Sequence, residues 1–141
     1  MQKNSIELNI KVQNQTKYLS LIGRIGEDIA KEIDRYSGDK ETLAYHLNLV
    51  LTEAMSNAIK YGKAEDNGES VNIFITISDK ELFIRIYDYG QGFDINEIAA
   101  PDFENLEDRG RGIYLIKTLM DSVSYLRNPQ GNMLEMIKLL R

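Results

Sequence analysis

The sequence predicts an α+β two-layer sandwich, in which helices cover one face of a mainly antiparallel sheet. Three observations lead to this fold class. Several segments alternate apolar and polar residues with the period of two that is typical of half-buried strands. Neighbouring alternating segments are joined by short turns, as in β-hairpins. Two long segments in the first half of the chain instead carry apolar residues at helical spacing.

The first half of the chain contains a strand and two helices. Residues 5–12 alternate and are predicted to form an edge or half-buried strand. Residues 16–36 repeat isoleucine and leucine at helical spacing, and Ser37-Gly38-Asp39 is expected to break this helix. Residues 40–61 are predicted to form a second helix, which Gly62 ends.

The second half of the chain contains two hairpins separated by a loop and a helix. Residues 71–78 and 82–88 are predicted to pair across a tight turn at residues 79–81. Residues 89–109 show no firm periodicity, and a loop of this length in a compact domain is usually functional. A helix is expected at residues 112–120, followed by a hairpin of residues 122–127 and 132–140. The predicted order is β-α-α-β-β-loop-α-β-β.

Composition and length narrow the class of protein. With 141 residues, 43% of them apolar and 28% charged, the chain suits one globular domain over residues 1–141. Cysteine is absent and His46 is the only histidine, which excludes disulfides and multi-histidine metal sites. The net charge of -5 argues against a nucleic acid as the main partner. We expect no membrane segment, no secretory signal and a cytoplasmic location, because no suitable apolar run is present.

The first motif, Glu53-Ala54-Met55-Ser56-Asn57, lies on the second predicted helix. Glu53 and Asn57 are one turn apart at the border of the apolar stripe, so both should be partly enclosed. A carboxylate there can accept a proton from a hydroxyl group or water, and an amide oxygen is a suitable ligand for Mg²⁺. Lys60 lies on the same side and could reach a phosphate. Taken alone, these residues also fit an ordinary solvated helix surface.

The second motif, Asp88-Tyr89-Gly90-Gln91-Gly92, follows a predicted strand. A carboxylate at the end of a strand can accept a hydrogen bond from the amino group of adenine. Gly90 and Gly92 would permit a ligand to approach the backbone closely. A plain turn is the alternative explanation, since Asp and Gly are common turn residues.

The third motif, Arg109-Gly110-Arg111-Gly112, precedes the third predicted helix. Free backbone N–H groups at a helix N-terminus favour phosphate oxygens, and Arg109 and Arg111 add cationic donors. No Gly-Lys-Ser/Thr occurs, so this is not the motif of P-loop enzymes. Together the three motifs supply a base, a metal ligand, an adenine acceptor and a phosphate cradle. This combination predicts a site for ATP and Mg²⁺.

At these residues the chain resembles the GHKL superfamily of ATP-binding domains, found in histidine kinases, type II topoisomerases, heat-shock chaperones and mismatch-repair ATPases. Glu53-x-x-x-Asn57 resembles its N box, Asp88-x-Gly90-x-Gly92 its G1 box and Gly110-x-Gly112 its G2 box. The resemblance extends over about residues 5–140. It implies a Bergerat-type sandwich, in which helices cover one face of a mixed, mostly antiparallel sheet, and a mobile ATP lid, here at about residues 94–109.

Within that superfamily the chain looks most like the bacterial anti-sigma factor serine-protein kinases. Those proteins bind a sigma factor, or phosphorylate a Ser or Thr of a small anti-sigma-factor antagonist, and are usually homodimers. The resemblance thus implies an ATP- and Mg²⁺-dependent protein serine/threonine kinase in transcription regulation.

The resemblance also assigns roles by position. Glu53 would be the general base and Asn57 would hold Mg²⁺, while Asp88 would bind adenine. The glycines of the G1 box would shape the base pocket and those of the G2 box would contact phosphates. One departure is visible, because Gly131-Asn132 stands where many members have Gly-Thr. No adenine contact is therefore carried over to this hairpin.

Two alternative functions remain. The first is a non-catalytic ATP-binding regulator that sequesters a protein partner. The second is a histidine-kinase-like component that acts in trans on a separate phosphoacceptor. Glu53 argues against both, since it supplies a base, and histidine-kinase domains usually carry Asn at this position.

Overall fold

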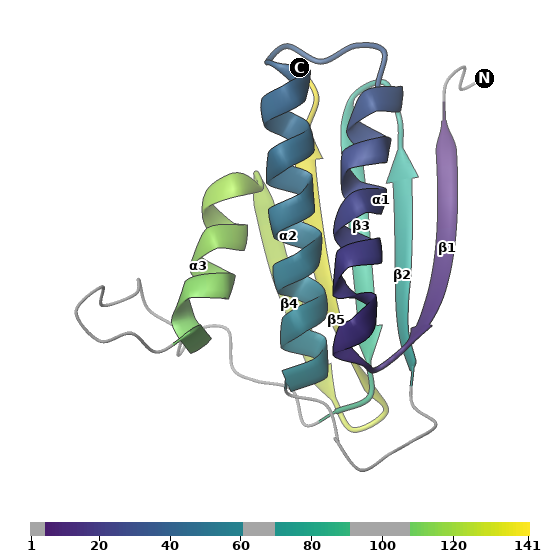
Figure 1. Ribbon diagram of the computed structural model, residues 1–141, viewed down its shortest axis with the longest axis vertical. Coiled ribbons are helices and arrows are strands. Elements are labelled where there is room, and N and C mark those ends of the chain that lie inside the picture. Colours follow the sequence, from purple (N-terminus) through teal and green to yellow (C-terminus); the bar gives the residue numbers. More distant parts are fainter. Residues whose placement is uncertain (1–4, 61–69, 91–107) are drawn as a thin grey trace.

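The computed structural model describes residues 5–60, 70–90 and 108–141. The elements in chain order, drawn in Figure 1, are β1 (Ile6–Gln13), the 3₁₀ helix η1 (Thr16–Tyr18), α1 (Leu19–Glu32), α2 (Lys40–Lys60), β2 (Ser70–Ile77), β3 (Glu81–Asp88), α3 (Asp108–Leu119), β4 (Ser122–Asn128) and β5 (Gly131–Leu139). This order confirms the predicted one. No helix among the described residues is both long and apolar enough to cross a membrane.

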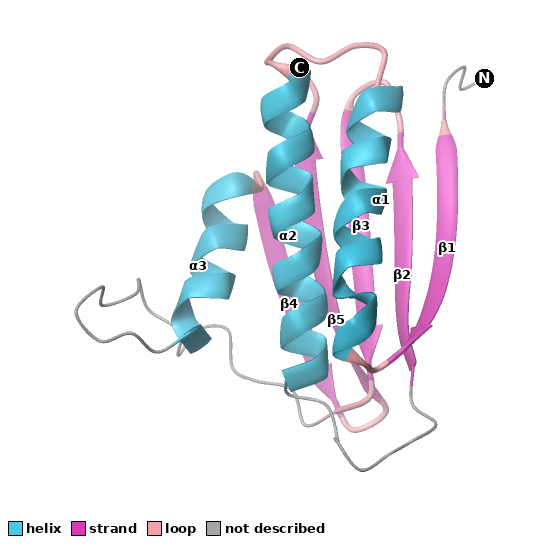
Figure 2. Cartoon of the chain, in the orientation of Figure 1, coloured by secondary structure: helices cyan, strands magenta, loops and turns pink. Residues whose placement is uncertain are grey.

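The five strands form one sheet in the order β1-β2-β3-β5-β4. All four strand pairings are antiparallel, which confirms the predicted sheet type. Figure 2 shows the helices gathered on one side of this sheet, as a two-layer sandwich requires. The register between β3 and β5 places Asp88 opposite Asn132 at one end of the sheet.

The core lies between the sheet and the helices. Alternate residues of the central strands face it and are almost fully buried, as the period of two predicts. The apolar stripe predicted on α2 faces it from the other side. The buried members of that stripe are Leu43, Leu47, Val50, Leu51, Ala54 and Ala58.

Helix α1 approaches α2 closely because two of its residues are glycines. A Cβ atom on Gly26 would lie 2.8 Å from the carbonyl oxygen of Leu47, and one on Gly23 would lie 2.6 Å from Thr52 Oγ1. Any larger residue at either position would push the helices apart or displace a neighbour. This contact fixes α2, the helix that carries Glu53 and Asn57, against α1.

Two helix boundaries differ from those predicted. Helix α1 ends at Glu32, and Ile33 is extended, with φ -77° and ψ 118°. The spacing of apolar residues did not reveal this end of the helix, because Ile33 is buried although it is not helical. Helix α3 begins at Asp108, four residues before the predicted Gly112. Two glycines in the first turns weaken a helix by about 1 kcal/mol each but do not prevent it.

The sheet face away from the helices, here called the open face, carries large apolar side chains around a charged pair. Phe74 and Tyr87 meet edge to face, with ring centroids 5.5 Å apart. Arg85 Nε donates to Glu135 Oε2 at 3.2 Å, and the guanidinium also lies over the ring of Phe83. Phe74 is 38% exposed, so this face offers apolar surface to a partner.

Candidate functional site

Helix α2 holds Glu53 and Asn57 at the edge of the core. Because the buried stripe fixes the rotation of the helix, Glu53 is half-buried and Asn57 is only 6% exposed. The predicted partial enclosure of both residues is thus found. The amide nitrogen of Asn57 is buried and has no hydrogen-bond partner in the described part of the chain. An unpaired buried amide group costs free energy, which a bound ligand would recover.

Helix α3 brings the third motif onto this pair. A Cβ atom on Gly112 would lie 2.6 Å from Glu53 Oε2 and 3.5 Å from Asn57 Nδ2. Glycine therefore lets the backbone of α3 lie close to Glu53, whereas the distance to Asn57 would still permit a Cβ atom. The structure joins the first and third motifs, which are more than fifty residues apart in sequence, into one site.

Substituting Gly112 with Ala tests this contact. The added methyl group meets the far end of a flexible carboxylate, so Glu53 should move and the fold should survive. Ala also favours a helix over Gly by about 1 kcal/mol, and the melting temperature should stay the same or rise. With Glu53 as the base that the resemblance implies, we expect phosphoryl transfer to fall at least about tenfold, because a misplaced base loses its geometry. An unchanged rate of transfer, measured beside the melting temperature, would contradict this role for the contact.

Asp88 is the last residue of β3 and is 6% exposed. Its Oδ1 accepts a hydrogen bond from the backbone N–H of Gly90 at 3.0 Å and one from Asn132 Nδ2 at 2.9 Å. Burial raises the pKa of this carboxyl group above its usual range, and the two hydrogen bonds oppose that rise in pKa. The second carboxylate oxygen, Oδ2, receives no hydrogen bond from any described residue.

Asn132 lies beside Asp88 and belongs to none of the three motifs. It is 1% exposed and donates to Asp88 and to the carbonyl oxygen of Gly90. Gly131 precedes it with φ +149°, a conformation that favours glycine. The antiparallel pairing of β3 with β5 creates this contact, so only a correct strand register would have predicted it.

The other predicted site residues are located less fully. Lys60 ends α2, and Arg109, Gly110 and Arg111 belong to the first turns of α3. Because α3 begins at Asp108, its first four N–H groups belong to residues 108–111, and the N–H group of Gly112 follows them. Gly92 lies outside the described residues, as does the predicted ATP lid apart from Asp108 and Arg109.

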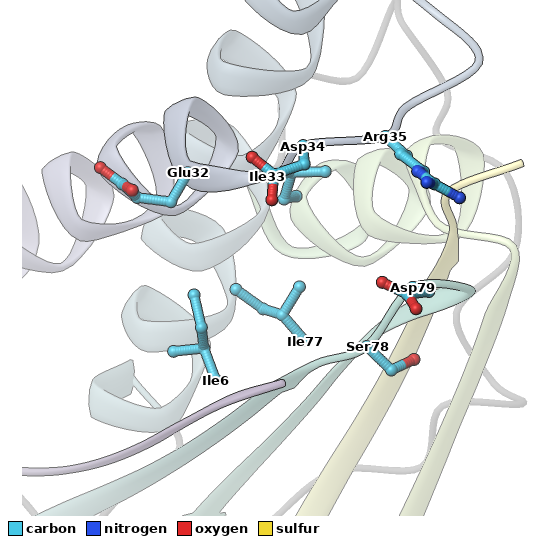
Figure 3. A pocket seen from close by; sticks show the side chains of 8 residues that line it. All are labelled: Ile6, Glu32, Ile33, Asp34, Arg35, Ile77, Ser78 and Asp79. Atoms are coloured by element: carbon cyan, nitrogen blue, oxygen red, sulfur yellow. The ribbon is translucent and has the colours of Figure 1, made fainter. Parts of the chain in front are cut away.

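The motif-bearing ends of the elements lie together. In Figure 1 the end of α2, the end of β3 and the starts of α3 and β5 all lie at the lower end of the molecule. A separate cavity of about 240 Å³ lies at the other end, where α1 ends and β2 turns into β3. Figure 3 shows its lining, which mixes Glu32, Asp34, Arg35 and Asp79 with Ile6, Ile33, Ile77 and Ser78. None of the motif residues lines this cavity.

The residues present fit a nucleotide with a hard metal ion. Asn57 offers a buried amide nitrogen that can donate to a phosphate oxygen, and Gly112 brings the backbone of α3 close to Glu53. Asp88 offers an acceptor oxygen at the end of a strand. Carboxylate, amide and phosphate oxygens form the donor set that Mg²⁺ prefers. The geometry is therefore suited to a phosphorylated ligand at α3 and a hydrogen-bond donor at Asp88.

The chain is similar in sequence to two curated serine-protein kinases. The serine-protein kinase RsbW of Bacillus subtilis (strain 168) is 26% identical over 148 residues, covering 99% of this chain and 89% of the relative. RsbW of Bacillus cereus (strain Q1) is 27% identical over 131 residues, covering 86% and 78%.

A solved structure shares the fold. It is a histidine kinase domain from the blue-light activated histidine kinase of Erythrobacter litoralis EL346, with a TM-score of 0.55 and 18% identity. The match covers 89% of this chain and 60% of that one. The family model of the histidine kinase-like ATPase domain matches residues 19–138, which is most of the sequence. The chain therefore belongs to the histidine kinase-like ATPase domain family.

Proposed function

We propose that this protein is an ATP- and Mg²⁺-dependent serine/threonine protein kinase. It acts as an anti-sigma factor in a partner-switching system and phosphorylates a small anti-sigma-factor antagonist. The observation that carries the proposal is the approach of Gly112 to Glu53 and Asn57, which supports a general base at Glu53 beside the start of α3. The similarity to serine-protein kinases over nearly the whole chain supports the same activity.

Each residue has a role in the proposed reaction. Glu53 accepts the proton of the substrate hydroxyl group while the hydroxyl oxygen attacks the γ-phosphorus. The bond from that phosphorus to its bridging oxygen breaks, and ADP leaves with the bridging oxygen. Asn57 would hold Mg²⁺ through its amide oxygen, and the metal ion would neutralise charge at the phosphates.

The remaining predicted residues would bind the nucleotide. Gly110 and Gly112 let the start of α3 approach the phosphates, and cationic groups of Lys60, Arg109 and Arg111 balance their charge. Asp88 accepts a hydrogen bond from adenine, and Gly90 and Gly92 shape the pocket around the base. Charge balance matters here because the chain carries a net charge of -5.

The homodimer expected from the resemblance belongs to this proposal, and the open face supports it. If two copies pack with their open faces together about a two-fold axis, Arg85 of each copy can pair with Glu135 of the other copy. The apolar rings of Phe74 and Tyr87 would pack around these charges, as in other sandwiches of two sheets.

Changing Phe74 to Asp should weaken this dimer, because it buries a charge in an apolar interface. We expect an apparent mass near that of a monomer in light scattering after gel filtration at micromolar concentration. Leu21→Asp is the matched control, since Leu21 is a 50% exposed apolar residue on α1 and should leave the dimer intact. A monomeric parent protein, or a dimer insensitive to the Phe74 change, would contradict the interface.

A labelling reaction tests the kinase proposal. Purified protein, Mg²⁺ and ATP labelled on its γ-phosphate are added to phosphatase-treated lysate of the source organism, with Glu53→Gln as control. We expect a small labelled protein whose phosphate survives acid and is missing with the variant. An acid-labile product would favour the histidine-kinase-like alternative. Normal ATP binding without any labelled product would favour the sequestering regulator.

A further inference from the structure

A lysine occupies a core-facing position of β5. Asn132, Leu134 and Met136 face the helices and are buried, and Lys138 continues the same alternation. Its neighbour on β3 is Leu82, which is fully buried. The side chain of Lys138 is only 18% exposed, so its ammonium group has lost part of its hydration and needs acceptors that replace the lost water. The contacts of this ammonium group therefore indicate what the lysine does.

The ammonium group of Lys138 holds the C-terminal end of α3. Its Nζ donates a hydrogen bond to the carbonyl oxygen of Leu119, the last residue of α3, at 3.1 Å. The last four carbonyl groups of a helix have no partner within the helix, so this bond satisfies one of them. A cation at this end also interacts favourably with the helix dipole. Nζ lies 3.9 Å from Asp121 Oδ2 as well.

Asp121 connects the same contact to the sheet. Its backbone N–H donates to the carbonyl oxygen of Ile137 at 2.9 Å, and its Oδ2 accepts a hydrogen bond from the backbone N–H of Leu139 at 2.7 Å. These two bonds continue the ladder between β4 and β5 by one residue. Lys138, Asp121 and the carbonyl group of Leu119, together called the α3 anchor, thus tie the end of α3 to β5.

Resting on the proposed function, we infer that Lys138 is a positioning residue for phosphate binding and transfer. The anchor lies at the opposite end of α3 from Gly112, and 12 residues give a helix about 18 Å long. Ile113 and Ile116 also pack α3 onto the core, but apolar contacts are non-directional, whereas the anchor adds directional bonds. A small rotation of α3 would move Gly112 away from Glu53, and a misplacement of about 1 Å can lower a rate about 100-fold.

Lys138→Met tests the anchor, because Met keeps the length of the side chain but cannot donate a hydrogen bond. In the nucleotide-free protein, hydrogen exchange of α3 amides should become about tenfold faster, while exchange in α2 stays the same. The dissociation constant of ATP should rise about tenfold, and transfer at saturating ATP should slow at least about tenfold. The melting temperature should stay the same or rise, since replacing a partly buried charge by an apolar group is often neutral or stabilising.

Lys117→Met is the matched control. It removes the same charge from the last turn of the same helix, but at an exposed position. Exchange of α3, ATP affinity and transfer should all stay at the values of the parent protein. Equal losses in both variants would assign the effect to charge near the helix end, and the inference would be wrong.

A double variant separates positioning from a general loss of packing. If Lys138 acts through the approach of α3 to Glu53, Lys138→Met should slow transfer less than about threefold once Gly112→Ala is present. Losses that multiply in full would show that Lys138 acts elsewhere. Unchanged exchange of α3, unchanged ATP affinity or a lowered melting temperature in Lys138→Met also overturns the inference, with the ATP site intact. A parent protein that neither binds ATP nor transfers phosphate instead refutes the proposed function itself.

Discussion

Glu53→Gln should reduce phosphoryl transfer by about 100- to 10,000-fold while changing ATP affinity little. Loss of a positioned general base typically costs this much in rate. The amide of Gln keeps the size of the side chain and its contact with Gly112, but it cannot take a proton from the substrate hydroxyl group. In the proposed site, nucleotide binding depends instead on α3, Asn57 and Asp88, which the substitution leaves in place.

The measurement pairs a single-turnover transfer assay with a calorimetric titration of ATP. Glu41→Gln is the matched control, because Glu41 is exposed at the first turn of the same helix and gives the same change in net charge. It should leave transfer and binding unchanged. If the Glu53→Gln variant transfers phosphate at the parent rate, Glu53 is not the general base. A loss of ATP binding together with transfer would instead assign Glu53 to the nucleotide site.

Much of the fold could be predicted because local patterns of apolar residues in the sequence determine it. Period-two alternation on β2, β3 and β5 sets which residues face the core, and the predicted stripe on α2 is the buried one. The ends of α1 and α3 were less predictable. Burial of Ile33 does not require a helix, and glycines that suggest a helix start can also lie inside the first turns.

For the candidate site, the sequence could predict only the proximity of residues that belong to the same local motif. Glu53 and Asn57 are one helical turn apart, so their proximity follows from spacing alone. The approach of Gly112 to Glu53 depends on how α3 packs against α2, which no local pattern encodes. The pairing of Asn132 with Asp88 depends on a strand register between residues 44 positions apart. Tertiary packing therefore places a residue beside Asp88 that the motifs do not contain.

Asp88→Asn is expected to weaken ATP binding by at least about 100-fold. The amide of Asn at position 88 can still accept hydrogen bonds from Gly90 and Asn132 through its oxygen. Its NH₂ group would then replace Oδ2 and face the amino group of adenine, so that a donor meets a donor. Loss of one hydrogen bond to a charged acceptor, with an unpaired donor left behind, accounts for an effect of this size. Calorimetry with ATP measures it, and an unchanged affinity would exclude Asp88 from base recognition.

The same substitution should stabilise the free protein near neutral pH. Burial raises the pKa of Asp88 in the folded state above its ordinary value of 3.8, so the folded protein holds this proton more tightly than the unfolded chain. The resulting contribution to stability is fully present below the ordinary pKa and is lost as the pH rises through the raised pKa. Asn does not titrate, and it therefore avoids this loss.

Melting temperatures across acidic to neutral pH, recorded without and with ATP, test both effects together. The advantage of Asp88→Asn over the parent protein should be absent below pH 3.8 and grow as the pH rises through the raised pKa. Asp79→Asn is the control, since it makes the same change in net charge at an exposed position. ATP at a concentration that saturates the parent protein should raise its melting temperature more than that of Asp88→Asn. A variant less stable than its parent at neutral pH would mean that the ionised carboxylate supports the fold. A variant that is more stable than its parent but binds ATP more weakly would mean that the protein keeps a costly buried charge because ATP binding requires it.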